Sequence, residues 1–364
     1  MSARATDARV RAERLRSHGL HTGMPSIVAA VERIGAMQAQ DFGAARWALG
    51  VRVPGSVEAD VDAAFAARRI VRTWPLRGTL HIMAAERLRE VLALTGPRIH
   101  QKDARRRREL ELDDDVAGLA RHIAERELAL GPRTRDQLQA AWEAAGIATG
   151  GQRGYHLLAW LALDAVICLG PAEGRDQRFV LVEDWLPASP RRERDEALAT
   201  LITSYFRGHG PATVRDAAWW SGLTLTDVRT AVAAAGDALT AFDDERLCAV
   251  DTADVEGASS TAPRASGRFA LPAFDEYFLG YADRSPVCDP GYAGRVVPGG
   301  NGVFQAILVD AGRVVGLWRR RDARRGATVT LDGFETDLDA RAFRRPLADW
   351  SRFRGVPLAE VRSG

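Results

Sequence analysis

Gly131-Pro132-Arg133-Thr134-Arg135-Asp136 recurs further along the chain as Gly210-Pro211-Ala212-Thr213-Val214-Arg215-Asp216. An amphipathic segment precedes each copy, residues 116–130 in the first case and 192–207 in the second. A Thr or Asp in each copy is a good N-cap for a short helix, and a turn and a further helix follow. The repeat therefore predicts two similar helical units.

The first copy also has a strand pair behind it. Residues 165–170 and 178–182 are rich in β-branched and apolar side chains, and Gly174-Arg175-Asp176 between them is a turn sequence. These features predict a β-hairpin. Helices closed by a hairpin are typical of a winged helix.

The N-terminal third fits the same plan more loosely, with helices expected at 10–18, 26–38 and 57–67 and strands at 70–74 and 80–83. We therefore predict three tandem winged helices. Their expected bounds are residues 1–100, 101–190 and 191–246.

The pattern changes from about Leu247 to short strands and turns, with strands expected at 268–271, 303–309 and 313–317. Residues 253–266 are rich in Ser, Ala and Gly and are expected to form a crossing loop. Residues 247–364 should form a small, barrel-like β-rich domain. The predicted class is α+β.

Composition limits the functional classes. The chain has 364 residues, 46% of them hydrophobic, and a formal net charge of only +2. A nucleic-acid surface would therefore have to come from the arrangement of its arginines. Cys168, Cys248 and Cys288 are widely spaced, which argues against disulfides and a structural zinc site. With no signal peptide and no apolar run long enough to span a membrane, we expect a cytoplasmic protein.

Met37-Gln38-Ala39-Gln40-Asp41, followed by Arg77-Gly78-Thr79-Leu80-His81, is the most informative chemical feature. A carboxamide does not titrate near neutrality, but its oxygen accepts and its nitrogen donates hydrogen bonds. Two of them suit a reaction whose leaving group departs easily. Hydrolysis at a sugar carbon that bears a cationic base is such a reaction, because the bond breaks towards an oxocarbenium ion.

Taken together, these motifs resemble the winged-helix DNA glycosylases of the AlkZ type along nearly the whole chain. Met37 to Asp41 is similar to that family's catalytic Gln-x-Gln, and residues 72–81 are similar to its second N-terminal signature. Residues 274–285 and 300–304 are similar to its C-terminal signatures. A related branch carries Gln-x-Asp, so Gln40 aligns this chain with the AlkZ branch.

The resemblance implies a C-shaped protein whose channel holds double-stranded DNA. It also implies hydrolysis of N7-alkylguanine and N3-alkyladenine glycosidic bonds, and unhooking of interstrand crosslinks, without a cofactor. A metal is not expected, because His18 and His21 have no third ligand near them in the sequence. Gln38 and Gln40 would hold the attacking water and direct their amide oxygens at the developing cation. Convergence of the two amides requires the chain to leave helical geometry, and Asp41-Phe42-Gly43 is the expected exit.

Other site residues are weaker candidates. His81 could orient a glutamine, contact a phosphate or simply pack, and Asp41 could serve as a base or as a helix cap. Thr79 is a further catalytic candidate. Phosphate contacts are expected from six arginines, with Glu109 partly neutralising the run at 105–108. These are Arg77, Arg105, Arg106, Arg319, Arg320 and Arg321.

The acidic residues Asp275, Glu276 and Asp283 would repel DNA, so we expect them to fix a loop through hydrogen bonds to backbone or Arg. Lys102 is the sole lysine and lies outside both N-terminal signatures, which favours a monofunctional enzyme over a lyase. A non-catalytic winged-helix transcriptional regulator is the alternative. A monomer is expected, and self-resistance and general repair both stay open as biological roles.

Overall fold

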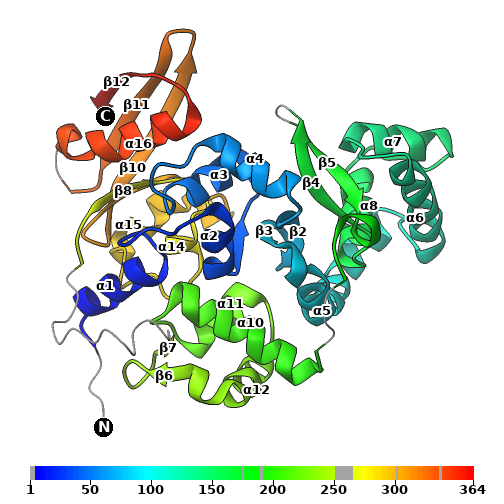
Figure 1. Ribbon diagram of the computed structural model, residues 1–364, viewed down its shortest axis with the longest axis horizontal. Helices are drawn as coiled ribbons and strands as arrows, with labels where there is room; N and C mark the ends of the chain where they lie inside the picture. The colour runs from blue at the N-terminus through cyan, green and yellow to red at the C-terminus, as the bar shows by residue number, and fades with distance from the viewer. Residues whose placement is uncertain (1–4, 174–175, 189–191, 251–264, 301, 336–337) are drawn as a thin grey trace.

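The computed structural model describes residues 5–173, 176–188, 192–250, 265–300, 302–335 and 338–364. Helices and strands are mixed throughout, which confirms the α+β class. In Figure 1 the C-terminal sheet and the β4–β5 hairpin rise from opposite ends of one side of the molecule, with α3 and α4 between them. This gives the chain the outline of a C. No helix among the described residues is long and apolar enough to cross a membrane.

The first helical unit differs from expectation at its centre. The predicted helix at 26–38 ends at Ile34, because Gly35 adopts a left-handed φ of 83° and the chain continues as a strand. The exit from helical geometry is therefore Gly35, and a new helix begins where the exit was expected. The elements are α1 (Asp7–Ser17), α2 (Ile27–Ile34), β1 (Ala36–Gln38), α3 (Phe42–Gly50), α4 (Glu58–Ala66), β2 (Ile70–Leu76) and β3 (Thr79–Ala84).

The second unit joins the first through a common sheet. Its hairpin pairs with β2 at Arg72 and Leu169, so that five strands run in the order β1-β3-β2-β4-β5. The predicted hairpin is confirmed for the described residues. The elements are a 3-10 turn (Ala85–Arg87), α5 (Leu88–Glu109), α6 (Asp114–Ala129), α7 (Arg135–Ala144), α8 (Arg153–Leu163), β4 (Ile167–Glu173), β5 (Asp176–Leu181) and α9 (Val182–Trp185).

The third unit repeats the local chemistry of the second. Thr134 and Thr213 each close a reciprocal capping box, with Gln137 and Asp216 as the partners three residues later. The strand that begins at Leu247 pairs with β6, so we propose that this unit ends after it rather than at residue 246. The elements are α10 (Arg194–His209), α11 (Val214–Ser221), α12 (Leu225–Ala235), a 3-10 turn (Gly236–Ala238), β6 (Leu239–Ala241) and β7 (Leu247–Ala249).

The C-terminal part is an open sheet, so the barrel-like expectation was wrong. Its strands run β12-β11-β10-β9-β8, and β8 and β12 are edge strands rather than partners. The crossing loop predicted at 253–266 lies almost entirely outside the described residues. The elements are β8 (Arg268–Leu271), α14 (Glu276–Leu279), α15 (Pro290–Val296), β9 (Ile307–Asp310), β10 (Arg313–Ala323), β11 (Gly326–Gly333), α16 (Arg344–Arg354) and β12 (Leu358–Ser363), with 3-10 turns at Pro298–Gly300 and Ala340–Phe343.

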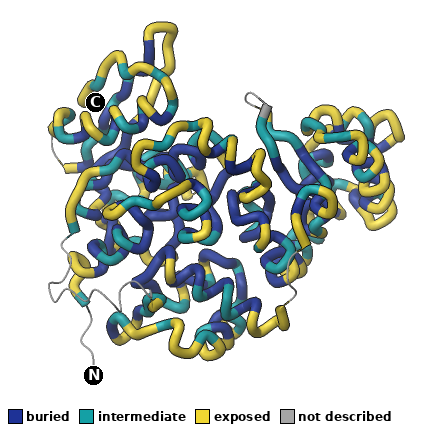
Figure 2. The backbone as a smooth tube through the Cα atoms, viewed as in Figure 1, coloured by how far each residue is buried: buried dark blue, intermediate teal, exposed yellow. Residues whose placement is uncertain are grey.

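One apolar core unites the first unit with the C-terminal sheet. The indole of Trp47 in α3 donates to the carbonyl of Ala270 in β8, and its ring lies 5.4 Å from that of Phe353 in α16. Trp318 in β10 lies in the same core and donates to Leu271. Figure 2 shows the buried backbone concentrated at this junction and beneath it, where α10 meets α2. Elements far apart in sequence are therefore held rigidly around β1.

Candidate active site

Gln38 is the last residue of β1 and lies in a row of polar side chains across the sheet. Its Cα pairs with that of His81 in β3, which in turn pairs with Thr73 in β2. Residues directly opposite one another on antiparallel strands project from the same face. The sheet therefore places these three side chains together, and the short strand β1 is what brings Gln38 into the row.

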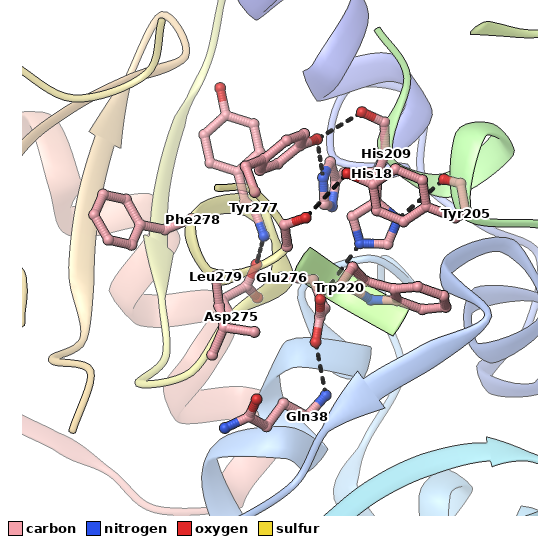
Figure 3. A network of polar contacts seen from close by, with 12 residues as sticks. His18, Gln38, Tyr205, His209, Trp220, Asp275, Glu276, Tyr277, Phe278 and Leu279 are labelled. Atoms are coloured by element: carbon pink, nitrogen blue, oxygen red, sulfur yellow. Dashed lines mark hydrogen bonds and ion pairs between the residues drawn. The ribbon is translucent and has the colours of Figure 1, made fainter. Parts of the chain in front are cut away.

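The Gln38 side chain is fixed from two directions. It is only 6% exposed, its amide oxygen accepts from Arg77 Nη2 at 3.0 Å, and its backbone N–H donates to Glu276 Oε1 at 2.9 Å. Figure 3 shows Gln38 and Glu276 facing each other across this bond. Arg77 also donates to the backbone carbonyls of Trp219 and Trp220 in α11. Gln38 is therefore tied to the third unit as well as to its own sheet.

Gln40 has a different environment. Its side chain is exposed, and its amide oxygen accepts from the backbone N–H of Leu80 at 2.8 Å. Between the two glutamines, the carbonyl of Ala39 accepts from Nε and Nη2 of Arg72 at 2.9 and 2.7 Å. The remaining Arg72 amine donates to Gln177 in β5 at 3.1 Å. The motif is thus also connected to the hairpin of the second unit.

Gln40 faces a cavity of about 530 Å³ between the first and second units. The lining includes Arg72 and Trp74 from β2, Thr134 and Arg135 at the start of α7, and Gln177 from β5, besides other residues of these units. Polar donors and acceptors from two units thus converge beside one glutamine. Gln38, in contrast, lies on the buried side of the same motif.

The partners determine how both amides point. An arginine amine and a backbone N–H can only donate, so each glutamine must present its oxygen to its partner and its NH₂ group elsewhere. A carboxamide oxygen carries two lone pairs, so each can accept a second hydrogen bond. Each amide oxygen can therefore accept a hydrogen bond from a water molecule, and the only titratable group in the motif, Asp41, is engaged as a helix cap.

Behind Gln38 lies a buried acid–imidazole pair. The second oxygen of Glu276 is 3.4 Å from Nε2 of His209, and neither side chain has exposed surface. Burial alone would raise the pKa of Glu276, but the contact with His209, together with the charge of Arg77, holds that pKa below its ordinary value. The carboxylate is therefore ionised at neutral pH.

A second buried network adjoins this pair. Arg52 makes a bidentate ion pair with Asp275 at 2.8 Å for both contacts, and its Nη2 lies 3.3 Å from Nδ1 of His18. His18 contacts the hydroxyl of Tyr281 at 2.9 Å, and that hydroxyl donates to the carbonyl of His209 at 2.7 Å. Burial, reinforced by neighbouring cations, lowers the pKa of His18 well below its ordinary value. The expectation that Asp275 and Glu276 fix a loop is confirmed.

His81 is buried and neutral. Its Nδ1 bonds to the carbonyl of Thr79 at 2.9 Å, and burial, together with the charge of Arg77, lowers its pKa to about 4. Its Nε2 and the hydroxyl of Thr73 have no partner among the described residues. His81 lies in the middle of the row and has no exposed surface for a phosphate.

Asp41 and Thr79 have local structural roles. Asp41 is the N-cap of α3 and accepts from the N–H of Ala44 at 2.9 Å, which is the cap alternative of the two that the sequence allowed. The hydroxyl of Thr79 donates to the carbonyl of Leu76 in the tight turn between β2 and β3. Neither contact directs the side chain at the two amides.

The predicted basic contacts divide into three groups. Arg77 points inward and its donors are engaged by protein oxygens, so its expected phosphate contact is not supported. Arg105 and Arg106 are exposed near the end of α5, where both pair with Glu109 as expected. Arg319, Arg320 and Arg321 are exposed on β10.

Sequence reasoning missed two residues that organise the motif, Arg72 and His209. It also missed that Glu276 binds the backbone of Gln38. The available signal for Glu276 was a carboxylate within the apolar run Phe274-Asp275-Glu276-Tyr277-Phe278-Leu279, because a buried acid is rarely left unpaired. Its partner could not have been identified without the fold.

Comparisons with known proteins agree with this arrangement. The family model described as "DNA glycosylase AlkZ-like" matches residues 31–353. The chain is 28% identical to an "Interstrand DNA cross-link repair glycosylase" from Streptomyces sahachiroi, with 93% of each chain covered. The solved structure of the Streptomyces sahachiroi DNA glycosylase AlkZ superposes with a TM-score of 0.76 at 26% identity, covering 99% of this chain and 100% of that one.

Proposed function

Because this chain belongs to the DNA glycosylase AlkZ-like family, we propose that it hydrolyses the N-glycosidic bond of cationic N7-alkylguanine and N3-alkyladenine lesions in double-stranded DNA. We further propose that it unhooks interstrand crosslinks, as the name of its Streptomyces relative indicates for that protein. The family match extends over most of the chain and supports an enzyme over a transcriptional regulator.

In the proposed mechanism, Gln38 and Gln40 hold one water molecule against the anomeric carbon. The single observation that carries this proposal is that two carboxamides lie two residues apart at the end of β1, each with an oxygen that accepts from a donor-only partner. Each oxygen has a second lone pair for the water. As the bond to the cationic base breaks, the same oxygens face the positive charge that develops on the sugar.

The reaction needs little acid–base assistance. The base already carries a positive charge and leaves without prior protonation, so a titratable general acid is unnecessary. The water attacks the oxocarbenium ion, which is a strong electrophile, so weak acceptors suffice to orient it, and the proton that the water then loses passes to solvent. Two observations agree with a reaction that needs no general acid or base: buried His81 is neutral, and Asp41 is engaged as a helix cap. We propose that His81 packs beside Gln38 in the row and takes no proton from the water.

The protein should act as a monofunctional glycosylase. A lyase reaction through a Schiff base requires an amine near the sugar, and Lys102 lies on the exposed surface of α5. We propose that phosphates are contacted by Arg105, Arg106, Arg319, Arg320 and Arg321, which would bind without reading sequence. The product would be an intact strand that carries an abasic site.

The test uses duplex DNA that contains N7-methylguanine. The protein should release free N7-methylguanine and leave an alkali-labile abasic site, while undamaged duplex of the same sequence stays intact. Replacing both glutamines, Gln38→Ala with Gln40→Ala, should abolish release and leave the Kd for DNA nearly unchanged. Gln101→Ala, an exposed glutamine in α5, is the matched control and should release base at the wild-type rate. Normal release by the double variant would refute the mechanism.

A further inference from the structure

Glu276 connects three elements that are distant in sequence. It begins α14, and its two carboxylate oxygens contact Gln38 in β1 and His209 in α10. The side chain has no exposed surface. It is too deeply buried to contact DNA, yet it makes the only hydrogen bond that the described residues offer to the Gln38 backbone N–H.

We propose that Glu276, oriented by His209, is a positioning residue that fixes the Gln38 backbone for base release. This inference rests on the proposed function, because it assumes that Gln38 holds the attacking water. It assigns Glu276 no contact with substrate and no proton transfer.

The position of β1 explains why such a residue is needed. β1 is an edge strand that pairs only with β3 among the described strands. The N–H of Gln38 is directed to Glu276 instead of to a strand, and a buried N–H without a partner is unfavourable. The Glu276 carboxylate therefore accepts the hydrogen bond from Gln38 that the carbonyl of a neighbouring strand would otherwise accept.

His209 is held firmly enough to orient the acid. Its Nδ1 lies 3.2 Å from the carbonyl of Tyr205, and its ring stacks on that of Tyr205 with centroids 4.6 Å apart and an interplanar angle of 13°. Figure 3 shows both rings beside the Glu276 side chain. Both nitrogens of His209 therefore lie next to oxygen atoms, which fixes the orientation of the ring.

Gly280 permits this contact. A Cβ at position 280 would lie 2.5 Å from Cδ2 and 2.8 Å from Nε2 of His209, which is closer than side-chain atoms approach one another. Any larger residue would push the imidazole away from Glu276. The contact between Glu276 and His209 thus also depends on the close packing of α14 against α10.

The consequences for the reaction follow from geometry. Arg77 fixes the amide end of Gln38 and Glu276 fixes its backbone, so both ends of one side chain are held. Releasing the backbone end lets the amide move relative to the water and the sugar. A displacement of about 1 Å can slow an enzyme by about 100-fold.

Two substitutions at one position test the proposal. Glu276→Ala removes the acceptor and should slow single-turnover release of N7-methylguanine by about 100-fold. Glu276→Gln keeps an oxygen for the Gln38 N–H and presents an NH₂ group to His209, so it should recover release to within about 10-fold of wild type. The Kd for the same DNA should be unchanged in both variants.

Hydrogen exchange gives a readout that does not depend on activity. Peptides that contain Gln38 should exchange faster in Glu276→Ala than in wild type and should be protected again in Glu276→Gln. Asp243→Ala is the matched control, because Asp243 is a buried carboxylate that accepts backbone N–H groups and pairs with Arg246 without contacting Gln38. Asp243→Ala should lower stability but leave release and Gln38 exchange unchanged at a temperature where it is folded.

If Glu276→Ala does not fold, Glu276→Asp provides the same comparison. Its carboxylate is one methylene too short to reach the Gln38 N–H and His209 together.

The outcomes separate this inference from the proposed function. Wild-type release by folded Glu276→Ala or Glu276→Asp, or equally slow release by Glu276→Gln, would overturn the positioning role. If the wild-type protein releases no base, the proposed function fails, and if Gln38→Ala releases base normally, the proposed role of Gln38 fails. In both cases the exchange comparison still decides whether Glu276 holds the Gln38 backbone.

Discussion

Gln38 and Gln40 are separated by one residue but belong to two different regions of the molecule. Gln38 lies on a buried side, where Arg77 and Glu276 contact it and His209 lies behind Glu276. Gln40 lies on an exposed side, where a backbone N–H orients it and a cavity opens beside it. The difference teaches that one glutamine is held at both ends by buried side chains, while the other is held only by a backbone N–H of β3 and stays exposed.

The largest effect should come from breaking the buried side at Asp275. Asp275→Ala leaves Arg52 without its carboxylate at a fully buried position, and losing one partner of a buried pair costs about 3–5 kcal/mol. The free energy of unfolding, measured in urea, should fall by that amount. An exposed ion pair contributes about 1 kcal/mol or less. A loss of that size for Asp275→Ala would show that the buried pair is no more important for stability than an exposed one.

Lowering the pH should also reduce the stability of the folded protein through the buried histidines. The pKa of His81 in the folded protein is about 4, below the ordinary value of 6.5, so the unfolded chain takes up a proton first as the pH falls. Stability is therefore fully present above pH 6.5 and decreases towards pH 4, and each unit of pKa difference is worth about 1.4 kcal/mol. His18 acts in the same direction.

The check for this pH effect is urea denaturation at pH 7 and pH 5 for wild type and His81→Leu. The variant lacks the titrating imidazole, so its stability should change less between the two pH values. An equal change in both proteins would contradict the assignment of buried neutral His81.

Arg77 tests the connection between Gln38 and the third unit. Arg77→Met removes the donor to Gln38 and the donors to Trp219 and Trp220, and base release should slow by about 30-fold, which corresponds to about 2 kcal/mol. DNA affinity should change little, since these donors are engaged within the protein. Arg105→Met is the matched exposed control and should lower affinity slightly without slowing release. Weaker DNA binding with an unchanged rate of base release in Arg77→Met would instead indicate that Arg77 contacts a phosphate.

The smallest effect is expected on the exposed side, at Asp41. Asp41→Ala removes an N-cap and should destabilise the protein by about 1 kcal/mol. Single-turnover release should stay within about 3-fold of wild type, because the carboxylate is not a general base here. Loss of release by 100-fold or more in a folded variant would assign Asp41 to the chemistry.

What could be predicted from the sequence follows the same division between local and tertiary structure. Helices that begin with a local capping box, such as those after Thr134 and Thr213, were expected at the right place because the cap and its partner are three residues apart. The strand β1 was missed because three residues form a strand only by pairing with β3, more than forty residues away. The open C-terminal sheet was mistaken for a barrel because strand content does not reveal whether the edges meet.

The candidate site shows the same limit. Gln38 and Gln40 were identifiable from their chemistry and from a family resemblance, but the inward direction of Arg77 depends on α11 packing against the β2–β3 turn. Glu276 and His209 are separated by 67 residues, and neither carries a local signal for the other. Contacts between distant elements therefore had to come from the structure.

The central claim is that two uncharged amides hold one water against the sugar. The most direct measurement is a high-resolution structure with duplex DNA that carries a cationic pyrrolidine nucleotide in place of the damaged one, as a mimic of the oxocarbenium ion. We expect one ordered water within hydrogen-bonding distance of both the Gln38 and Gln40 oxygens and facing the position of the anomeric carbon. A complex in which either amide lies away from that atom, or turns its NH₂ group towards the cation, would contradict the claim.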